Sequence, residues 1–356
     1  MKGSKLRSNQ APDGKLAEAW LPVLQAKARL PVCVALGSPR QAVELVETIP
    51  LDQPVLYQMD LHQADSTRQL LKERNFTATV ATHADLWDLP SDFQTVIYPV
   101  ESRGERMLKL DVIEQAFHIL KPGGILIVLS RQESEQFFPA ALKKIYGRFH
   151  IPDIADATLL WSLRTGDRPR RRHELIFQVS NPDGPSLRFV SRPGVFSYGR
   201  FDNGARALVE TTIINPGDRI LDLGCGCGTN GILCGLRGGA GSHVTFVDSN
   251  CRATTLAEMN ATANGLTSFD VKTCSRLDGL AEKSFDIVLA NPPYYANLSI
   301  AESFIASARA MLKPGGRLWL VTKQPHEIAK MLAERFVSTE AVERRGYVVM
   351  CATARI

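Results

Sequence analysis

The sequence predicts an α/β protein in which one fold, a mainly parallel sheet with helices between its strands, occurs twice. Two observations support this prediction. In the second half of the chain, short apolar runs rich in β-branched residues alternate with segments of helical periodicity, as βαβ units do. In addition, the Lys-Pro-Gly-Gly sequence at 121–124 recurs 192 residues later, at 313–316. A repeat this long indicates a domain duplication and not a solenoid.

The same offset of 192 residues aligns the segments that precede the Lys-Pro-Gly-Gly turn. It places the apolar stretch 93–97 on 285–289, and both stretches have the pattern of a buried strand. Between strand and turn, six apolar positions of a predicted helix coincide in the two halves: Leu108, Val112, Ile113, Ala116, Ile119 and Leu120 fall on Ile300, Phe304, Ile305, Ala308, Met311 and Leu312. Strand, helix, turn and following strand therefore match without a gap.

The elements of the second half follow one another in regular alternation. The pattern predicts strands at 219–223, 243–247, 269–273, 285–290 and 317–322, and helices at 229–237, 251–264 and 299–312. The stretch 347–354 is apolar and β-branched enough for a closing strand, which we expect to form an antiparallel hairpin with a strand around 335–342. The first domain is expected to span 15–178 and the second 195–356, with a turn-rich linker at 179–194.

The strand at 219–223 runs into a loop with glycine at every second position, Gly224, Gly226 and Gly228. A dinucleotide-binding loop needs the spacing G-x-G-x-x-G, whereas Thr229 stands in place of the third glycine. Glycine has no Cβ and lets the backbone approach a ligand closely. The pattern favours a loop that lies against the methionine part of S-adenosylmethionine; the alternative is an ordinary tight turn between strand and helix.

Two acidic residues accompany this loop. Asp222 precedes the first glycine, and its carboxylate can take the amino group of the methionine part. Asp248 ends the strand at 243–247 and is placed to accept both ribose hydroxyls. In a doubly wound sheet both positions lie near carboxyl strand ends, where such folds bind ligands.

A second motif, Asn291-Pro292-Pro293-Tyr294, directly follows the strand at 285–290. The exocyclic amine of a purine is a poor nucleophile because its lone pair is delocalised into the ring. The Asn291 side-chain carbonyl and the Pro292 backbone carbonyl can each accept one N–H and so orient the nitrogen. The prolines remove two N–H donors, and Tyr294 offers a stacking face for an extruded base. Because the sulfonium donor is already activated, alignment should supply most of the catalysis and no metal is required. The alternative is a proline turn that ends a strand.

Composition limits the classes of protein that fit. The 356 residues suffice for two domains, and 42 Lys and Arg against 37 Asp and Glu give a net charge of +5, which is compatible with a nucleic-acid partner. No apolar run is long enough for a membrane span, and the amino terminus lacks the apolar core of a signal peptide. The seven cysteines include no C-x-x-C pair. We therefore expect reduced thiols, no metal, no membrane and a cytoplasmic location.

The first half keeps the scaffold without these motifs. The offset of 192 residues places Pro99 opposite Asn291, and Ala35 and Pro39 stand where the acid and the second glycine should be. We expect this domain to be degenerate, either as a structural partner or as an RNA-binding surface. Five arginines near its end, opposed only by Asp167, are either a solvated face or a phosphate contact: Arg164, Arg168, Arg170, Arg171 and Arg172.

With these motifs the chain resembles the bacterial two-domain ribosomal RNA guanine-N2 methyltransferases, in which a degenerate domain precedes a catalytic one. The segment 196–204 resembles the signature of that family, which packs over the cofactor. The resemblance implies two tandem Rossmann-like class I methyltransferase domains, with S-adenosylmethionine as cofactor. It also implies a monomer that methylates guanine N2 in ribosomal RNA, either free or within a ribosomal particle.

The resemblance also assigns residues one by one. The glycine-loop and strand-end positions match cofactor-binding positions: Asp222, Gly224, Gly226, Gly228 and Asp248. The polar residue expected to contact adenine falls at Ser275. The later motif matches the catalytic tetrad, Asn291, Pro292, Pro293 and Tyr294, and Asn291 also borders the cofactor.

Other functions share part of this evidence. The Asn-Pro-Pro-Tyr motif also occurs in adenine-N6 methyltransferases and in enzymes that methylate glutamine in release factors. We would expect the first to carry a target-recognition domain and the second a small helical bundle, and the repeat supports neither. A small metabolite is disfavoured as substrate because the tetrad handles planar amines and amides. A non-catalytic RNA-binding or assembly protein is the alternative from a different class.

Overall fold

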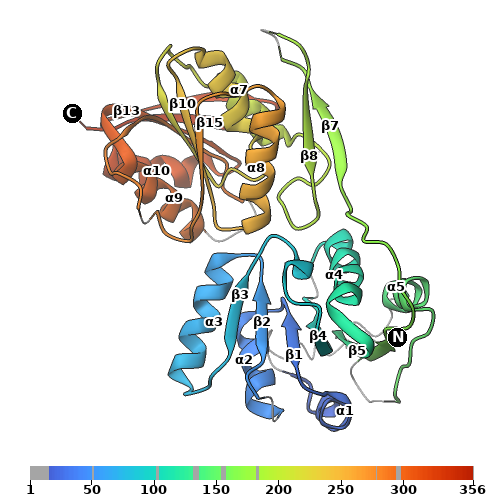
Figure 1. Ribbon diagram of the computed structural model, residues 1–356. Coiled ribbons are helices and arrows are strands. Elements are labelled where there is room, and N and C mark those ends of the chain that lie inside the picture. The colour runs from blue at the N-terminus through green and yellow to red at the C-terminus, as the bar shows by residue number, and fades with distance from the viewer. Residues whose placement is uncertain are drawn as a thin grey trace, which may run out of the picture. The chain divides into compact units, whose positions relative to one another are not determined.

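The chain consists of two compact units, Met1–Arg171 and Arg172–Ile356, called the first and second unit below (Figure 1). The computed structural model describes residues 16–49, 52–101, 104–130, 136–153, 158–181, 184–277, 279–293 and 298–355. The division falls before the linker that we predicted at 179–194. That stretch contains strand β8 (Leu187–Ser191), which pairs with β7 (Leu175–Val179) in a two-stranded antiparallel sheet.

The first unit contains a six-stranded sheet in the order β3-β2-β1-β4-β5-β6. Its first five strands are parallel and β6 is antiparallel to β5. The strands are β1 (Val32–Ala35), β2 (Val55–Gln58), β3 (Thr79–Thr82), β4 (Phe93–Pro99), β5 (Leu120–Ser130) and β6 (Thr158–Leu163). The helices are α1 (Leu21–Lys27), α2 (Pro39–Thr48), α3 (Leu61–Glu73), α4 (Arg106–Ile119) and α5 (Phe137–Tyr146), with short 3-10 turns at Glu18–Trp20 and Leu86–Asp88.

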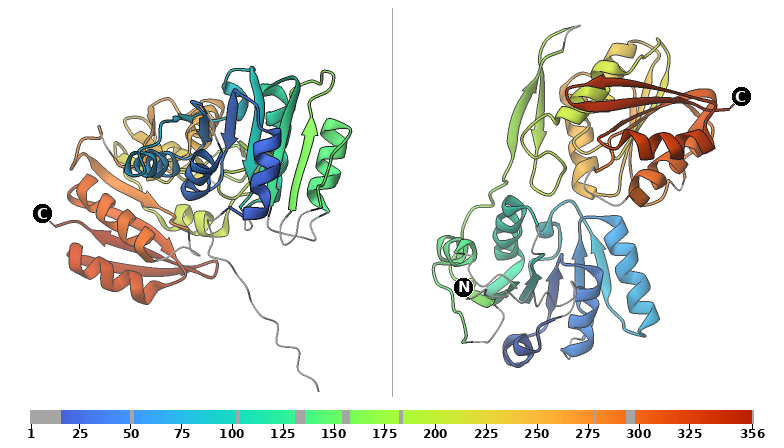
Figure 2. Two further views of the ribbon diagram at one scale, coloured as in Figure 1. Left: turned by 90° about the horizontal axis from the view of Figure 1, so that it is seen from below. Right: turned by 180° about the vertical axis from the view of Figure 1, so that it is seen from behind.

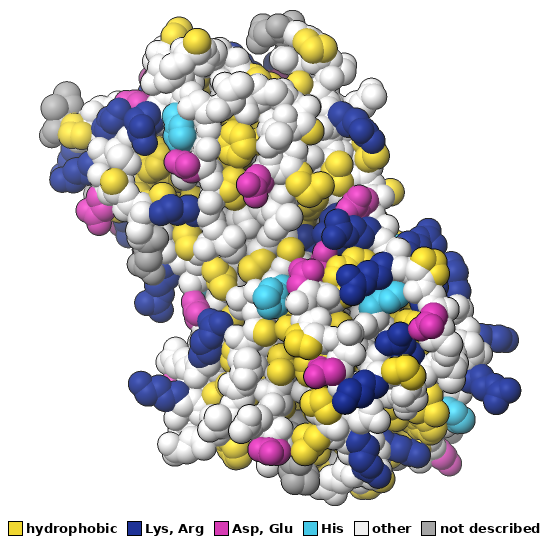
Figure 3. Space-filling view, in the orientation of Figure 1, with side chains coloured by type: hydrophobic (Ala, Val, Ile, Leu, Met, Phe, Trp, Pro, Cys, Tyr) yellow, Lys and Arg dark blue, Asp and Glu magenta, His cyan; other side chains and the backbone are white. Residues whose placement is uncertain are grey.

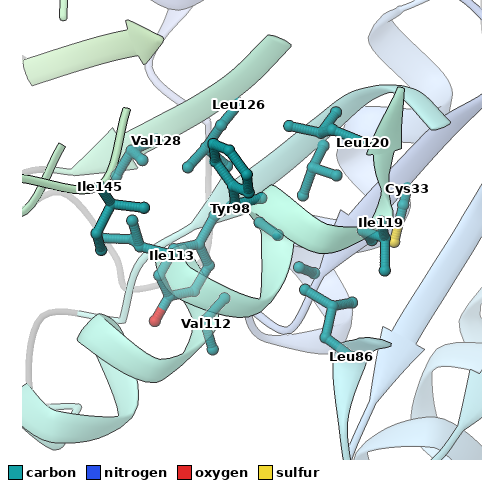
Figure 4. Packing of buried hydrophobic residues seen from close by; sticks show 14 of the residues in the cluster. Cys33, Leu86, Tyr98, Val112, Ile113, Ile119, Leu120, Leu126, Val128 and Ile145 are labelled. Atoms are coloured by element: carbon teal, nitrogen blue, oxygen red, sulfur yellow. The ribbon is translucent and has the colours of Figure 1, made fainter. Parts of the chain in front are cut away.

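Alternate residues of the first sheet face two separate apolar layers. One layer joins the sheet to α4 and α5, and the other joins it to α1, α2 and α3. In the first layer Ile145 of α5 lies near Val128 of β5, and Ile113 of α4 lies near Tyr98 of β4 (Figure 4). A sheet covered on both faces by helices accounts for the nearly continuous apolar runs of its strands.

The second unit contains a seven-stranded sheet in the order β11-β10-β9-β12-β13-β15-β14. Its strands are β9 (Arg219–Leu223), β10 (His243–Asp248), β11 (Phe269–Thr273), β12 (Phe285–Ala290), β13 (Leu312–Thr322), β14 (Ser338–Arg344) and β15 (Tyr347–Thr353). The first five are parallel, and β15 and β14 form the predicted antiparallel hairpin at one edge (Figure 2). The helices are α6 (Asn203–Thr211), α7 (Thr229–Gly238), α8 (Cys251–Ala263), α9 (Leu298–Met311) and α10 (Pro325–Arg335).

Two apolar layers again cover the sheet of the second unit. Helices α6, α7 and α8 pack on one face, against side chains such as Ile220 and Leu289. Helices α9 and α10 pack on the other face, against Leu221 and Val288. Successive side chains of a strand point to opposite faces of the sheet. Ile220 and Leu221 of β9 therefore pack in different layers, as do Val288 and Leu289 of β12.

The Lys-Pro-Gly-Gly sequences lie within β5 and β13, so that these strands begin earlier than we predicted. The pairing register shifts at the same place in both units: Phe93 pairs with Leu120 but Thr95 with Ile125, and Phe285 pairs with Leu312 but Ile287 with Arg317. Gly123 and Gly315 have φ of +77° and +76°, a conformation that favours glycine. The two units thus share a backbone irregularity as well as the sequence that produces it.

Helix α7 approaches β10 closely enough to require glycine at one crossing point. A Cβ on Gly231 would lie 2.4 Å from Cε1 of Phe246 and 3.0 Å from Cγ1 of Val244, and both of these side chains are fully buried. The short distance to the sheet fixes the start of α7, and with it the glycine loop that leads into the helix.

We expect Gly231→Ala to lower the free energy of unfolding by roughly 2 kcal/mol, because overpacking a rigid core outweighs the gain of about 1 kcal/mol in helix propensity. Urea unfolding measures this change. Combining Gly231→Ala with Phe246→Leu, which removes the opposing ring, should cost less than the sum of the two single changes. An alanine variant as stable as the wild type would contradict the close approach.

Candidate active site

Three predicted site segments begin side by side at the carboxyl edge of the second sheet. Leu223, the last residue of β9, pairs with Val247 of β10 on one side and with Ala290 of β12 on the other. The residues that follow therefore leave the sheet at the same level. Strand β9 also lies at the point where the connections change direction across the sheet, since α7 and α8 cover one face and α9 and α10 the other. Open α/β sheets bind ligands at such a point.

The glycine loop is fastened to the end of β10. The backbone N–H groups of Gly224 and Cys225 both donate to the Val247 carbonyl, at 2.8 and 2.9 Å. The three glycines of the loop have φ of +72°, +55° and +86°, so a side chain at any of them would be strained. On one side Gly224 lies against the ring of Phe304 in α9, whereas a Cβ on Gly226 would meet only Val195, at 4.0 Å. Gly224 is thus exposed but backed by Phe304, whereas Gly226 is half-buried with free space on the side where a Cβ would lie.

Asp248 joins the end of β10 to both neighbouring turns. Its Oδ2 accepts from the Gly226 N–H and its Oδ1 from the Asn250 N–H, each at 2.9 Å. The side chain is half-buried. These bonds orient the carboxylate between the glycine loop and the turn that begins α8.

Asp222 occupies a different place from the one that we expected. Its side chain is buried, with 1% of the residue exposed, and its Oδ2 accepts from the Gly231 N–H at 2.8 Å. The carboxylate therefore lies beneath the glycine loop and joins β9 to the first turn of α7. An atom that water cannot reach cannot contact a bound molecule without rearrangement, so the burial supports an indirect role for Asp222.

Burial also changes the titration of this carboxyl. Desolvation raises the pKa of Asp222 from 3.8 to about 7; the Gly231 N–H bond opposes the increase and the negative charge of Asp248 adds to it. At neutral pH the Asp222 carboxyl beneath the glycine loop is thus close to its midpoint of ionisation.

The tetrad begins directly after β12. Asn291 is half-buried, Pro292 is buried and Pro293 is exposed, whereas Tyr294 lies outside the described residues. The Asn291 Nδ2 donates toward the Oδ2 of Asp202 over 3.5 Å, at the long limit of a hydrogen bond.

Ser275 lies at the same edge of the sheet but farther from the tetrad. It is half-buried and follows β11 by two residues, and Thr273 at the end of β11 pairs with Asp248. Two strands, β10 and β9, separate it from β12. The site residues thus span four adjacent strand ends.

Sequence reasoning missed three polar residues of α8 and its cap, which hold the surroundings of the loop. Asn250 Nδ2 donates to the Gly194 carbonyl at 2.8 Å, and the buried Arg252 donates to the Pro193 carbonyl at 2.5 Å. Asn260 Nδ2 donates to the Cys227 carbonyl at 2.9 Å. The first two fix the residues just before the segment 196–204 that resembles the family signature. For one of them, Arg252, a charged residue on the inner side of a predicted helix was the sequence signal.

The corresponding edge of the first unit is filled by its own residues. A Cβ on Gly37, which follows β1, would lie 2.5 Å from Cγ of Pro99, the residue at the position of Asn291. Gln58 ends β2 as Asp248 ends β10, is buried, and donates to the Gly37 carbonyl at 3.1 Å. The proline ring therefore closes the place that lies between the glycine loop and Asn291 in the second unit.

The cysteines of the glycine loop are buried and uncharged. Burial raises the pKa of Cys227 to about 12 and that of Cys225 well above its usual value. All seven cysteines of the chain are free thiols. Among the described residues, no three His, Cys, Asp or Glu side chains gather in a way that could hold a metal ion. The described helices also include none with the length and apolar character of a membrane span.

A family model of the methyltransferase small domain matches residues 186–351, which lie within the second unit. The second unit is thus similar to the methyltransferase small domain over most of its length.

Curated relatives carry a more specific name. Ribosomal RNA small subunit methyltransferase C of Pseudomonas aeruginosa (strain UCBPP-PA14) is 32% identical over 208 residues, which are 56% of this chain and 61% of that protein. The protein of the same name from Chromohalobacter salexigens is 37% identical over 147 residues, 39% of this chain and 43% of the relative. The chain thus spans about three fifths or less of the length of these relatives.

A solved structure extends the likeness of the fold to both units. The 16S rRNA N2 methyltransferase (RsmC) of T. thermophilus, in complex with AdoMet and guanosine, matches with a TM-score of 0.74 and covers 96% of this chain and 93% of that chain. The sequence identity is 21%. At this identity the match shows a shared fold over the covered part of the chain.

Proposed function

We propose that the second unit transfers a methyl group from S-adenosylmethionine to the exocyclic N2 amine of a guanine in ribosomal RNA. The observation that carries this proposal is the pairing of Leu223 with both Val247 and Ala290, because it brings the glycine loop, Asp248 and Asn291 to adjacent strand ends. The names of the curated relatives support the same substrate class.

The residues at the edge of β9 and β10 fit the cofactor. The glycine loop, exposed at Gly224 and free on the Cβ side of Gly226, would allow close approach of the methionine part, and the half-exposed carboxylate of Asp248 would accept the ribose hydroxyls. We assign Gly224, Gly228 and Ser275 to the same cofactor site, with Ser275 toward the adenine. Asp222 would act from below, by holding the loop to α7.

The tetrad provides the acceptors for the substrate amine. When bound, S-adenosylmethionine supplies a methyl group on a sulfonium that is already activated. Asn291 Oδ1 and the Pro292 carbonyl would each accept one N–H, which holds the nitrogen lone pair in line with the methyl group. The stacking role that we assign to Tyr294 stays a prediction.

We infer that the two units arose by duplication and that the first has lost the chemistry. The shared register shift at the Lys-Pro-Gly-Gly turns supports a common origin. Pro99 against Gly37 explains why the first unit would bind no cofactor at its own strand ends. Its remaining role would be to support the second unit or to bind RNA.

For RNA, the exposed end of the arginine run is the part that we propose to contact phosphates. The guanidinium groups of Arg164 and Arg168 lie 5.2 and 5.6 Å from the centre of the Phe117 ring and therefore serve the packing of the first unit. Arg170 also lies over a ring, at 5.5 Å from the centre of Trp87, but both Arg170 and Arg171 are exposed. Figure 3 shows further Lys and Arg side chains over the visible face of the same unit. The affinity that such phosphate contacts provide falls as the salt concentration rises.

Cofactor binding tests the first half of the proposal. Calorimetry should show that the wild-type chain binds S-adenosylmethionine and that Asp248→Ala binds it at least about 10-fold more weakly, because the ribose would lose a charged acceptor and Gly226 would lose its anchor. Asp270→Ala, an exposed change on β11, is the matched control and should bind as the wild type does. Absence of binding by the wild-type chain would favour a non-catalytic protein.

The substrate is tested by mapping methylated bases in ribosomal RNA from cells with and without the protein. A guanine N2 methyl group that disappears with the gene and returns on incubation with the purified chain supports the proposal. Loss of an adenine N6 methyl group, or methylation of a protein glutamine instead, would replace it by one of the alternatives that share the tetrad.

A further inference from the structure

The amide of Asn291 has a neighbour that the sequence did not associate with it. Asp202 lies 89 residues earlier, in the segment that precedes the catalytic sheet, and its Oδ2 is 3.5 Å from the Asn291 Nδ2. The same oxygen accepts from the Ala205 N–H at 2.9 Å, because Asp202 caps helix α6. Helix α6 packs on the sheet beside α7. The bond from the Ala205 N–H therefore holds the Asp202 carboxylate in place independently of Asn291.

The chemistry of the two groups fixes which way the amide points. A carboxylate can only accept hydrogen bonds, whereas an amide has a donating and an accepting end. With the reverse orientation, Asn291 Oδ1 would face Asp202 Oδ2 and two acceptors would repel each other. The pair thus keeps Nδ2 toward Asp202 and turns Oδ1 to the opposite side, and it does so before a substrate arrives.

We propose that Asp202 is a positioning residue for methyl transfer, which keeps the carbonyl end of Asn291 turned toward the substrate amine. This rests on the proposed function, in which that carbonyl accepts an N–H of the base. Asp202 itself does not touch the reacting atoms. Its contribution is preorganisation, since an amide that could rotate would present its donor end to the amine for part of the time.

Two variants separate positioning from helix capping. Asp202→Ser keeps a good N-cap but its side chain is too short to reach Asn291. We expect kcat to fall about 10-fold, with the melting temperature, the affinity for S-adenosylmethionine and the KM for RNA nearly unchanged. Asp202→Asn should retain at least a third of the wild-type kcat, because its Oδ1 can cap the helix and face the Asn291 Nδ2 from the same position. The substrate is ribosomal RNA from cells that lack the protein.

Asp60→Ser is the matched control, because Asp60 caps α3 in the first unit through a 3.1 Å bond from the Gln63 N–H. It should leave kcat unchanged. Wild-type kcat in Asp202→Ser would overturn the positioning role, as would equal losses in Asp202→Ser and Asp202→Asn. A loss of kcat together with stability and cofactor affinity would assign Asp202 a structural role only. If the wild-type chain itself transfers no methyl group, the proposed function fails instead.

Discussion

Asn291→Ala is expected to reduce methyl transfer at least 100-fold while the affinity for S-adenosylmethionine stays within about threefold of the wild type. The reason lies in where the residue stands: it follows β12 beside the glycine loop, but the cofactor contacts that we propose come from the ends of β9, β10 and β11. Removing the amide takes away the acceptor that orients the amine. Although Asn291 also borders the cofactor, the proposed contacts at the glycine loop, Asp248 and Ser275 remain. Single-turnover transfer with radiolabelled cofactor measures the first quantity, and calorimetry the second.

Asn264→Ala offers a control of the same chemistry in the same unit. The Asn264 side chain bonds to both backbone groups of Arg188, so its loss also removes an amide that braces the fold. We expect it to lower stability by about 1 kcal/mol and to leave the rate of transfer unchanged. Comparable transfer by Asn291→Ala and Asn264→Ala would remove Asn291 from the catalytic assignment.

The second large effect concerns Asp222 and pH. Because its pKa is about 7 in the folded chain and near 3.8 when exposed, the folded state holds a proton that the unfolded state releases between these values. The free energy of unfolding therefore falls as pH rises from about 4 to 7 and levels off above, by up to about 4 kcal/mol in total. Asp222→Asn keeps an acceptor for the Gly231 N–H and does not ionise.

The difference in unfolding free energy between Asp222→Asn and the wild type should accordingly grow with pH across this window, in favour of the variant. Urea unfolding without cofactor at pH 4.5, 6 and 8 measures it. Any constant cost of the buried amide group cancels in the comparison, since only the change with pH is attributed to the carboxyl. A difference that stays the same at all three pH values would show that Asp222 titrates as an exposed acid does.

The regular part of the fold could be predicted because its signals are local. Strands β9 to β12 and helices α7 and α8 lie within a residue or two of their predicted bounds. Strands β9, β10 and β12 are buried and mainly apolar, whereas the edge strand β11 alternates apolar and polar residues. Helix α10 was missed because charged residues interrupt its apolar positions and only one side packs. Strand β8 was taken for a linker, since its partner β7 is an exposed and equally short strand.

The site was predictable as a set of positions and less so as a set of contacts. Strand order and register, which bring Asp248 and Asn291 to the glycine loop, follow from the doubly wound pattern. The direction of a side chain does not: Asp222 points under the loop because Gly231 offers an N–H there. The contact of Asp202 with Asn291 joins residues that are 89 positions apart, and no periodicity of the sequence predicts it.

Strand β14 is exposed along its whole length and forms the free edge of the second sheet. An uncovered edge is a template on which strands of other molecules can add. Glu340, Glu343 and Arg344 place charge along it, and Arg344 and Arg345 are tied to Glu210 of α6 at 2.8 and 2.7 Å. A strand arriving from outside would have to desolvate these groups, so the same hairpin that completes the sheet also discourages aggregation through it.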